Sequence, residues 1–444
     1  MELIKVGGSV LRTRQGFESF LTIVNDTRKP VLVIVSAFAK ATRSLSYVAA
    51  VAESGYKRKA LALLQDIFDE HKKFTRLIIK DQSAIIELFN SIDGYYTKLA
   101  QIIEGIAITK ELSLRIKDIV LSYGEKLALL IISRYLDSNN MQHLTIDAGD
   151  IIVSDEYFGQ AKPLERETAK NIEKFLLPAL RSKRIVIMQG FVAKSKNGET
   201  TTMGIESSNL TAVLMAKLLH LKKITFRTDV CGIRDFDPRI VAGTKLVNRL
   251  NYADAFRFGK AGLKLIYPTM IDYAKDSDIE LVYMAASCPP GEQTSIQSGR
   301  TYIEPVVIAA QGKSINRIKV SSEDEISKVM AIMRNMFDKK IISSSYLKLK
   351  DDELIFITND GENYEKMFKG LDYYKDSNIS IITLFNVPFD KLASLLIKRR
   401  NERKVFPALI KLIDFSEDYV AIGIKERYTK TVLTFLSRHL EALK

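Results

Sequence analysis

The sequence predicts an α/β domain built on a largely parallel sheet, followed by a smaller α+β region. Strand-like and helix-like segments alternate through residues 1–297, an order that is typical of parallel sheets. The strand-like segment 29–38 is a nearly continuous apolar run, which indicates a strand buried on both faces. Beyond residue 297 the pattern changes to short β-α-β units, which favours a second domain over 298–444.

The alternation begins with "ELIKVGGSVL", a short strand that runs into a glycine turn. Residues 42–136 are helical in pattern and contain no proline. Strand character returns at 143–154. A helix is predicted over 167–182, and we expect it to stop near Pro178 because proline removes a backbone donor.

The next strand is predicted at 184–193, followed by the hydroxyl-rich stretch "NGETTTMGIESSNLTAVLMAKLL" at 197–219, which leads into an apolar helix. Ser208 or Asn209 is its expected N-cap. Residues 222–241 form a strand with an acidic loop, and 251–286 two helices and a strand. The stretch "SCPPGEQTSIQSGR" is rich in Pro, Gly and Ser, so it is predicted to be a linker or loop.

The C-terminal region contains two sets of short elements, plausibly two ferredoxin-like modules without a strong internal repeat. The first set is 317–322, 325–337 and 354–358, and the second is 408–415, 419–425 and 431–443.

Composition is that of a globular protein, with 444 residues of which 46% are hydrophobic. No apolar run approaches the ~20 residues of a membrane span, and the N-terminal residues do not have the pattern of a secretion signal. The two cysteines, Cys231 and Cys288, lie far apart and give neither a disulfide framework nor metal-ligand spacing. A cytoplasmic location is therefore expected.

The formal net charge is +13, and the basic residues are spread along the whole chain. The sequence contains neither a basic stripe interleaved with aromatic residues nor a zinc knuckle, so neither feature predicts nucleic-acid binding. A charged, solvated surface with anionic ligands is the favoured interpretation, without a nucleic-acid or membrane partner.

Three short motifs could carry chemistry. In "KVGGSV", Lys5 stands at a strand end before Gly7 and Gly8, where backbone N–H groups and a cation could approach phosphate oxygens. Taken alone, the motif favours a simple turn after a strand. In "SAFAKATR", small residues follow a strand, where open α/β sheets bind ligands, although Thr42 could equally be a helix cap.

The third motif is "LSYGEKLALLIISRYL" at 121–136. Spacing alone favours a capping box formed by Ser122 and Glu125 at a helix start. The alternative is that Glu125 faces a cleft as a carboxylate that binds an ammonium group.

A further loop, 227–241, contains several aspartates and arginines around Gly232. It could bind a nucleotide, or be a solvated turn. The four histidines do not form a metal site or a catalytic triad with neighbours in the sequence.

Taken in order, these and later motifs resemble the aspartokinases of the amino-acid kinase superfamily, from the first residues to about 297. The matching segments are "KVGGSV", "VIVSAFAKAT", "SYGEKLA", "QGFVA" with "NGETTTMG", "RTDVCGIRDFDPRIV" and "GLKLIYP". The resemblance implies a three-layer α/β/α kinase domain over 1–297, with a substrate lobe at about 1–185 and a nucleotide lobe at about 186–297. It also implies a tandem ACT-like regulatory domain at 298–444, where the likeness is looser.

The implied activity is phosphorylation of the β-carboxylate of L-aspartate by ATP with Mg²⁺, giving 4-phospho-L-aspartate for lysine, threonine and methionine synthesis. Lys5 and Lys264 are the implied catalytic cations. The implied substrate-binding residues are Thr42, Glu125, Arg43, Ser208 and Asn209, with Glu125 on the α-ammonium. The implied nucleotide-binding residues are Lys5, Gly7, Gly8, Ser9, Thr228, Asp229, Arg234, Asp237, Arg239 and Lys264. No protein metal site is implied.

One motif departs from the family pattern Thr-Thr-x-Gly-Arg-Gly-Gly-Ser-Asp. Ile205 stands where an arginine is expected to clamp a substrate carboxylate, and Asn209 stands where an acidic residue is expected. Arg234 and Tyr267 also replace a frequent tyrosine and a histidine.

Three explanations follow. Arg43 or Lys40 replaces the missing cation, the substrate is another acidic metabolite, or the chain is a non-catalytic amino-acid sensor. The first is favoured because the phosphate-side residues are all retained. The resemblance further implies a homodimer or larger oligomer and an amino-acid effector at the C-terminal modules.

Overall fold

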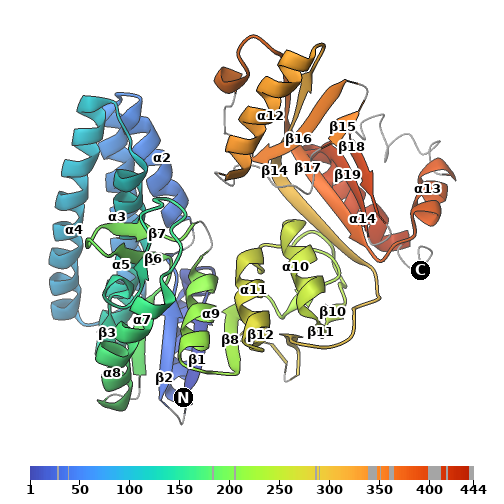
Figure 1. The fold of residues 1–444 in the computed structure, drawn as a ribbon. Helices are drawn as coiled ribbons and strands as arrows, with labels where there is room; N and C mark the ends of the chain where they lie inside the picture. The colour runs from blue at the N-terminus through green and yellow to red at the C-terminus, as the bar shows by residue number, and fades with distance from the viewer. Residues whose placement is uncertain are drawn as a thin grey trace. The chain divides into compact units, whose positions relative to one another are not determined.

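The chain folds into two compact units, and it passes between them several times. The computed structural model describes residues 1–444 except 28–29, 39, 183–184, 205–206, 286–287, 290, 339–347, 351, 360–364, 399–411, 417–418 and 440–444. The first unit comprises 1–233, 248–252 and 267–300, and the second comprises 234–247, 253–266 and 301–444 (Figure 1).

The first unit is built on an eight-stranded sheet with the order β11-β13-β12-β8-β1-β2-β5-β3. The strands are β1 (Glu2–Val6), β2 (Val31–Val35), β3 (Leu144–Ile146), β5 (Ile185–Gln189), β8 (Lys223–Thr228), β11 (Arg249–Leu250), β12 (Glu280–Ala285) and β13 (Thr294–Ile296). The six strands from β12 to β3 are parallel to one another. All five residues of β2 are buried, which confirms the expectation from its continuous apolar run.

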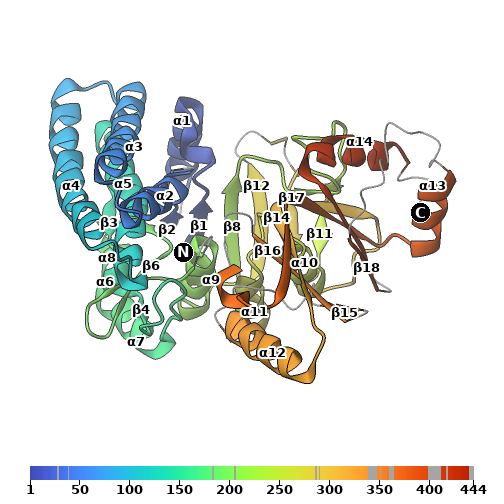
Figure 2. The same ribbon diagram turned by 90° about the horizontal axis from the view of Figure 1, so that it is seen from above.

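Helices cover both faces of this sheet. The helices are α1 (Arg14–Asn25), α2 (Ala41–Glu53), α3 (Lys57–Ile78), α4 (Gln82–Thr109), α5 (Leu114–Ser138), α6 (Ala148–Ile151), α7 (Glu165–Asn171), α8 (Leu177–Ser182), α9 (Ser208–Leu218) and α11 (Pro268–Asp276). Helices α1 to α5 share one core with alternate residues of β1 and β2. Figure 2 shows α9 and α11 on the opposite side of the sheet from α1. The predicted parallel α/β domain is confirmed.

A smaller sheet lies beside these layers. It consists of β4 (Val153–Ser154), β6 (Val192–Ser195) and β7 (Thr200–Thr202), in the order β4-β6-β7. Two further short strands, β9 (Ile233–Arg234) and β10 (Leu246–Val247), pair with each other.

Five local predictions differ from the structure, and three of them concern helix starts. The capping box at Ser122 does not exist, because α5 begins two turns earlier with Ser113 as its N-cap, and Ser122 and Glu125 lie inside the helix. The cap of α9 is Ser207, without a side-chain hydrogen bond, rather than Ser208 or Asn209. Thr42 is not a cap either, because it lies within α2, whose N-cap is Lys40.

The helix expected to stop near Pro178 continues to Ser182. A π-helical turn, η2 (Ile172–Leu176), precedes the proline, and the N–H of Leu177 bonds to the carbonyl of Ile172. This wider turn accommodates the proline ring and its missing donor. Part of the predicted linker at 287–300 is also ordered, since Thr294–Ile296 forms β13 antiparallel to β12.

The second unit contains a six-stranded antiparallel sheet with the order β15-β16-β14-β17-β19-β18. Its strands are β14 (Val306–Lys319), β15 (Lys348–Lys350), β16 (Glu353–Asn359), β17 (Asp372–Phe385), β18 (Leu412–Phe415) and β19 (Tyr419–Lys425). Its helices are α10 (Tyr252–Lys260), which begins in the first unit, α12 (Glu323–Asp338), α13 (Phe389–Lys398) and α14 (Thr429–His439). The predicted elements at 408–411 and 440–443 lie outside the described residues.

Two separate cores lie at the two ends of the long strands β14 and β17. One packs α12 against Ile318, Leu354 and Phe356. The other packs α13 and α14 against residues that include Ile382 and Val420. The two predicted β/α modules are therefore present, and they share one continuous sheet.

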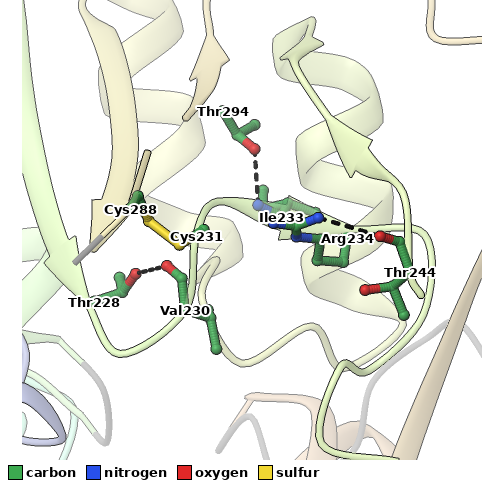
Figure 3. Close-up of a disulfide and its surroundings, with 8 residues drawn as sticks. All are labelled: Thr228, Val230, Cys231, Ile233, Arg234, Thr244, Cys288 and Thr294. Carbon is green, nitrogen blue, oxygen red and sulfur yellow. Dashed lines mark hydrogen bonds between the residues drawn. A yellow bond between two sulfur atoms is a disulfide. The ribbon is translucent and has the colours of Figure 1, made fainter. Parts of the chain in front are cut away.

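The expectation that the two cysteines are independent is wrong. Cys231 and Cys288 form a disulfide, although 57 residues separate them in the chain (Figure 3). The reason is topological. Strands β8 and β12 are adjacent and parallel, so the loops after their carboxyl ends meet at one edge of the sheet. Among the described helices, none combines the length and the apolar character needed to cross a membrane.

Candidate active site

The glycine turn after β1 is held against the loop after β8. The Gly7 N–H donates to the carbonyl of Arg227 over 3.0 Å, and the Ser9 hydroxyl donates to Asp229 Oδ1 over 3.0 Å. Strand β1 lies between β2 and β8, which the chain reaches in opposite directions, so this is a topological switch point. Open α/β sheets bind ligands outside the carboxyl ends of strands at such points.

Lys5 and Gly7 leave room for an anion at this turn. A Cβ on Gly7 would lie 3.4 Å from the Arg227 carbonyl oxygen and 3.9 Å from the Lys5 ammonium nitrogen. The ammonium group therefore lies close above the turn. Backbone N–H groups and a cation at one point are the elements of a phosphate site.

Glu125 brings a buried carboxylate to the same edge of the sheet. The residue is 3% exposed, and its Oε1 accepts a 3.4 Å hydrogen bond from the N–H of Ala37, just beyond β2. Its Oε2 is buried without a hydrogen-bond partner among the described residues. Burial raises the pKa of this carboxyl to about 8, although the Ala37 N–H and the charge of Lys5 oppose that rise. This oxygen can accept a hydrogen bond from a bound donor.

Thr42 and Arg43 lie in the first turn of α2, and Thr42 lies close to Gly124, the neighbour of Glu125 in the chain. A Cβ on Gly124 would lie 3.2 Å from the Ala37 side chain and 3.6 Å from Thr42 Oγ1, so α5 and α2 approach closely here. Arg43 is exposed and forms no ion pair with any described residue. Lys40 precedes the helix with a φ of 76°, a left-handed conformation that turns the chain from β2 into α2.

Asp118 binds the hydroxyl-rich stretch through hydrogen bonds to Thr202. It is 0% exposed and lies on α5, seven residues before Glu125. Its Oδ2 accepts the N–H of Gly159 at 2.8 Å and that of Thr202 at 3.0 Å, and its Oδ1 accepts the Thr202 hydroxyl at 2.6 Å. Burial raises the pKa of this carboxyl, and the three donors oppose the rise. The helix that carries Glu125 thus also fixes the end of β7.

The turn at Gly190 and Phe191 connects β5 to β6 and packs against the start of α9. A Cβ on Gly190 would lie 2.7 Å from the Cα of Ser208, so only glycine fits. Phe191 has a φ of 69°, and its N–H donates to Thr211 Oγ1 at 3.1 Å. Its carbonyl accepts the N–H of Met203. Such strain is stored where surrounding contacts enforce it, often at functional sites.

Ser208 and Asn209 are the first residues of α9 and are buried. Ile205, the departure from the family pattern, lies outside the described residues. Thr202 and Gly204, just before it, are well defined. A Cβ on Gly204 would lie 3.5 Å from the Tyr267 hydroxyl oxygen, so the turn packs against the segment that begins α11.

Four of the predicted nucleotide residues belong to the second unit. The Arg239 guanidinium forms two 2.9 Å hydrogen bonds to the Asp237 carboxylate, one to each oxygen. Burial alone would raise the pKa of Asp237, but Arg239 and the charge of Lys264 bring it below its usual value. Arg234 donates to the carbonyl of Thr244 at 3.1 Å. The other predicted site residues belong to the first unit, where contacts of the glycine turn join Ser9 to Asp229. They are Lys5, Gly7, Gly8, Ser9, Thr42, Arg43, Glu125, Ser208, Asn209, Thr228 and Asp229.

Sequence comparison identifies the family of this chain. The family model described as "Amino acid kinase family" matches residues 1–282. The chain belongs to the amino acid kinase family. Among curated relatives, the lysine-sensitive aspartokinase 3 of Escherichia coli is 27% identical over 307 residues, which is 68% of this chain and 65% of that enzyme. The bifunctional aspartokinase/homoserine dehydrogenase of Buchnera aphidicola is 26% identical over 281 residues, 61% of this chain and 33% of that protein. The chain therefore spans less than two thirds of the length of these relatives.

Solved structures agree on the fold. Escherichia coli aspartokinase III in complex with aspartate and ADP superposes with a TM-score of 0.78 and 19% identity, covering 99% of this chain and 100% of that one. The same enzyme in complex with lysine and aspartate gives a TM-score of 0.71 and 20% identity, covering 99% of both chains. The resemblance to aspartokinases drawn from the ordered motifs is confirmed, and so is the predicted fold class.

The sequence motifs did not identify two residues of this amino acid kinase domain, Asp118 and Arg227, as candidates for the site. Asp118 could have been found, because a residue seven before Glu125 on a helix lies on the same face two turns earlier. Arg227, one residue before Thr228, has a half-buried guanidinium whose Nε lacks a partner among the described residues, and burial lowers its pKa. In the described part of the chain, no group of three His, Cys, Asp or Glu side chains could hold a metal ion.

Proposed function

We propose that this amino acid kinase transfers the γ-phosphoryl group of MgATP to the β-carboxylate of L-aspartate, giving 4-phospho-L-aspartate and ADP. The observation that carries the proposal is the buried Glu125 carboxyl, with one oxygen lacking a partner among the described residues. An ammonium group is a ligand that such a carboxyl can bind through a charge-assisted hydrogen bond. An amino acid whose α-ammonium meets Glu125 satisfies that oxygen and favours the ionised form of the carboxyl.

The remaining roles follow from position and charge. Lys5 and the N–H groups of Gly8 and Ser9 bind phosphate oxygens, and Asp229 holds Ser9 in place. Thr228, Asp229, Arg234, Asp237, Arg239 and Lys264 bind the nucleotide, and Thr42, Arg43, Ser208 and Asn209 bind the amino acid. Mg²⁺ would enter with ATP and would supply positive charge to the phosphate groups.

The reaction does not require a general base. A free carboxylate has a pKa of about 4, so the β-carboxylate of aspartate is already a nucleophile at neutral pH. Catalysis then consists of in-line positioning and neutralisation of charge on the transferring group, which Lys5 and Lys264 supply. This chemistry fits a site built from glycines, lysines and hydroxyls.

The test measures the product directly. Full-length protein is incubated with MgATP and L-aspartate, ADP release is recorded, and the acyl phosphate is trapped with hydroxylamine as the hydroxamate. L-Glutamate and N-acetylglutamate serve as competing substrates. We expect aspartate-dependent ADP and hydroxamate in equal amounts. Turnover with another acid only would favour a different acidic substrate, for which the absence of an arginine at Ile205 is the motivating observation. Nucleotide binding without any turnover would favour the non-catalytic sensor.

The pathway, location, effector and oligomeric state of the protein can also be proposed. We propose that the product supplies lysine, threonine and methionine synthesis, as the names and complexes of the relatives support, and that the reaction takes place in the cytoplasm. Escherichia coli aspartokinase III has been solved with lysine, so we propose an amino-acid effector for the second unit. We also propose a homodimer, checked by light scattering with and without lysine or threonine.

A further inference from the structure

The disulfide between Cys231 and Cys288 lies at the carboxyl edge of the sheet. Cys231 is three residues beyond the end of β8, and Cys288 is three residues beyond the end of β12. The last residues of the two strands, Thr228 and Ala285, are paired in register. Both cysteines are partly exposed, so a redox partner can reach the bond.

The loop that contains Cys231 begins with Thr228 and Asp229, which the proposed function assigns to the nucleotide. Apart from the disulfide, the described contacts of this loop are hydrogen bonds, which include that of the Gly232 N–H to the Val230 carbonyl, and the packing of the Ile233 side chain, which is 1% exposed. Thr228 Oγ1 donates to the Val230 carbonyl at 2.7 Å, and the Ile233 N–H donates to Thr294 Oγ1 at 2.7 Å (Figure 3). The Ser9 hydroxyl bonds to Asp229. Figure 3 shows the disulfide between the first two of these contacts, as the covalent anchor of the loop.

We propose that Cys231 and Cys288 form a redox-modifiable site that controls nucleotide affinity, with the oxidised form binding ATP and ADP more tightly. This rests on the proposed function, since it takes residues 228–233 as part of the nucleotide site. A dithiol reductant attacks the bond, and a mixed disulfide forms and resolves. Two electrons and two protons pass to the protein, giving two thiols, and the reductant leaves as its own disulfide.

The physical cause is preorganisation. With the bond intact, the loop is tied to β12 and its conformations are few before the nucleotide arrives. After reduction, the hydrogen bonds at Thr228, Asp229 and Ile233 and the burial of the Ile233 side chain are left to order the loop, and binding must supply the remaining ordering free energy. A bond that served only as a structural brace would change unfolding and leave nucleotide affinity unchanged.

The experiment uses the full chain, oxidised with diamide or reduced with dithiothreitol, with thiols counted by alkylation and mass spectrometry. ADP affinity is measured by calorimetry, which does not depend on turnover. We expect reduction to weaken ADP binding by about fivefold or more, and to raise the KM for ATP while the KM for aspartate stays constant. Cys231→Ser and Cys288→Ser should both match the reduced protein and lose the redox response.

Three outcomes overturn the proposal. These are equal ADP affinity in both states despite a shift in Tm, two free thiols after oxidation, or a redox response that persists in Cys288→Ser. The outcome for the kinase activity is separate. If aspartate is not phosphorylated but reduction still weakens ADP binding, the redox site stands and the proposed substrate fails.

Discussion

The Asp118 carboxylate holds both the backbone N–H and the hydroxyl of Thr202, and the same helix presents Glu125 seven residues later. The position of helix α5 thereby determines the positions of two features of the site. These are the buried carboxyl that we assign to the substrate ammonium and the turn that lacks the family's arginine.

Asp118 offers a test that separates charge from geometry. In Asp118→Asn, the amide oxygen can accept both N–H groups now bound to Oδ2, but the amide nitrogen cannot accept the Thr202 hydroxyl, so we expect a loss of about 1 kcal/mol. Asp118→Leu strands two buried N–H donors, and we expect it to lose roughly 2–5 kcal/mol of stability. We expect surviving Asp118→Leu protein to show a raised aspartate KM with unchanged ADP affinity.

Thr202→Val is the matched control for Asp118, because it removes one hydroxyl and leaves both N–H bonds. Its effect should be smaller than that of Asp118→Leu, about 1 kcal/mol. Steady-state kinetics and urea unfolding measure both quantities. A rise in the ATP KM instead of the aspartate KM would contradict the assigned position of this turn.

Glu125 should release a proton when the substrate binds. The carboxyl has a pKa of about 8 in the free protein because of burial, so it is largely protonated at pH 7. An ammonium ligand favours the ionised form, and we expect close to one proton per aspartate bound. Calorimetry in buffers with different ionisation enthalpies measures it. Glu125→Gln should bind aspartate far more weakly, and any residual binding should release no proton.

The same carboxyl should make the ligand-free protein less stable as pH rises. Its folded pKa of about 8 lies above the usual 4.5, so between these values the folded state holds a proton that the unfolded state has lost. This contribution is complete below pH 4.5 and disappears as pH rises through 8, with a slope of at most about 1.4 kcal/mol per pH unit. Urea unfolding at pH 5.5 to 8.5 tests it, and the slope should flatten in Glu125→Gln.

Arg43 is the candidate for the missing clamp. It is exposed in the first turn of α2, beside Thr42 and without an ion pair to a described residue. We expect Arg43→Ala to raise the aspartate KM by about tenfold or more, as loss of a guanidinium–carboxylate pair does, with the ATP KM almost unchanged. Arg58→Ala, an exposed arginine on α3, is the control. An unaltered aspartate KM would remove Arg43 from the site.

Gly190 should not tolerate a side chain. In Gly190→Ala the new Cβ would lie 2.7 Å from the Cα of Ser208, so the start of α9 must move. We expect a loss of roughly 1–3 kcal/mol and reduced aspartate affinity. Gly94→Ala is the control, because a Cβ there has no neighbour within 4 Å and alanine favours a helix by about 0.5–1 kcal/mol. Thermal unfolding compares the two, and equal stability would refute the close contact.

The sequence by itself determined the class of fold, the order of its elements and the family. A continuous apolar run such as that of β2 predicts a strand buried on both faces, because it depends only on local hydrophobicity. Six motifs in a fixed order identify the aspartokinase pattern, since that order is itself a property of the sequence.

Only the tertiary structure decided what each side chain contacts. Spacing favoured Glu125 as a helix cap, but the true start of α5 at Leu114 places it inside the helix, buried beneath the end of β2. The two cysteines gave no signal in sequence, because their partnership arises from the adjacency of β8 and β12. Asp118 and Thr202 are 84 residues apart. Contacts of this kind depend on which strands and helices become neighbours, which local patterns of residues do not record.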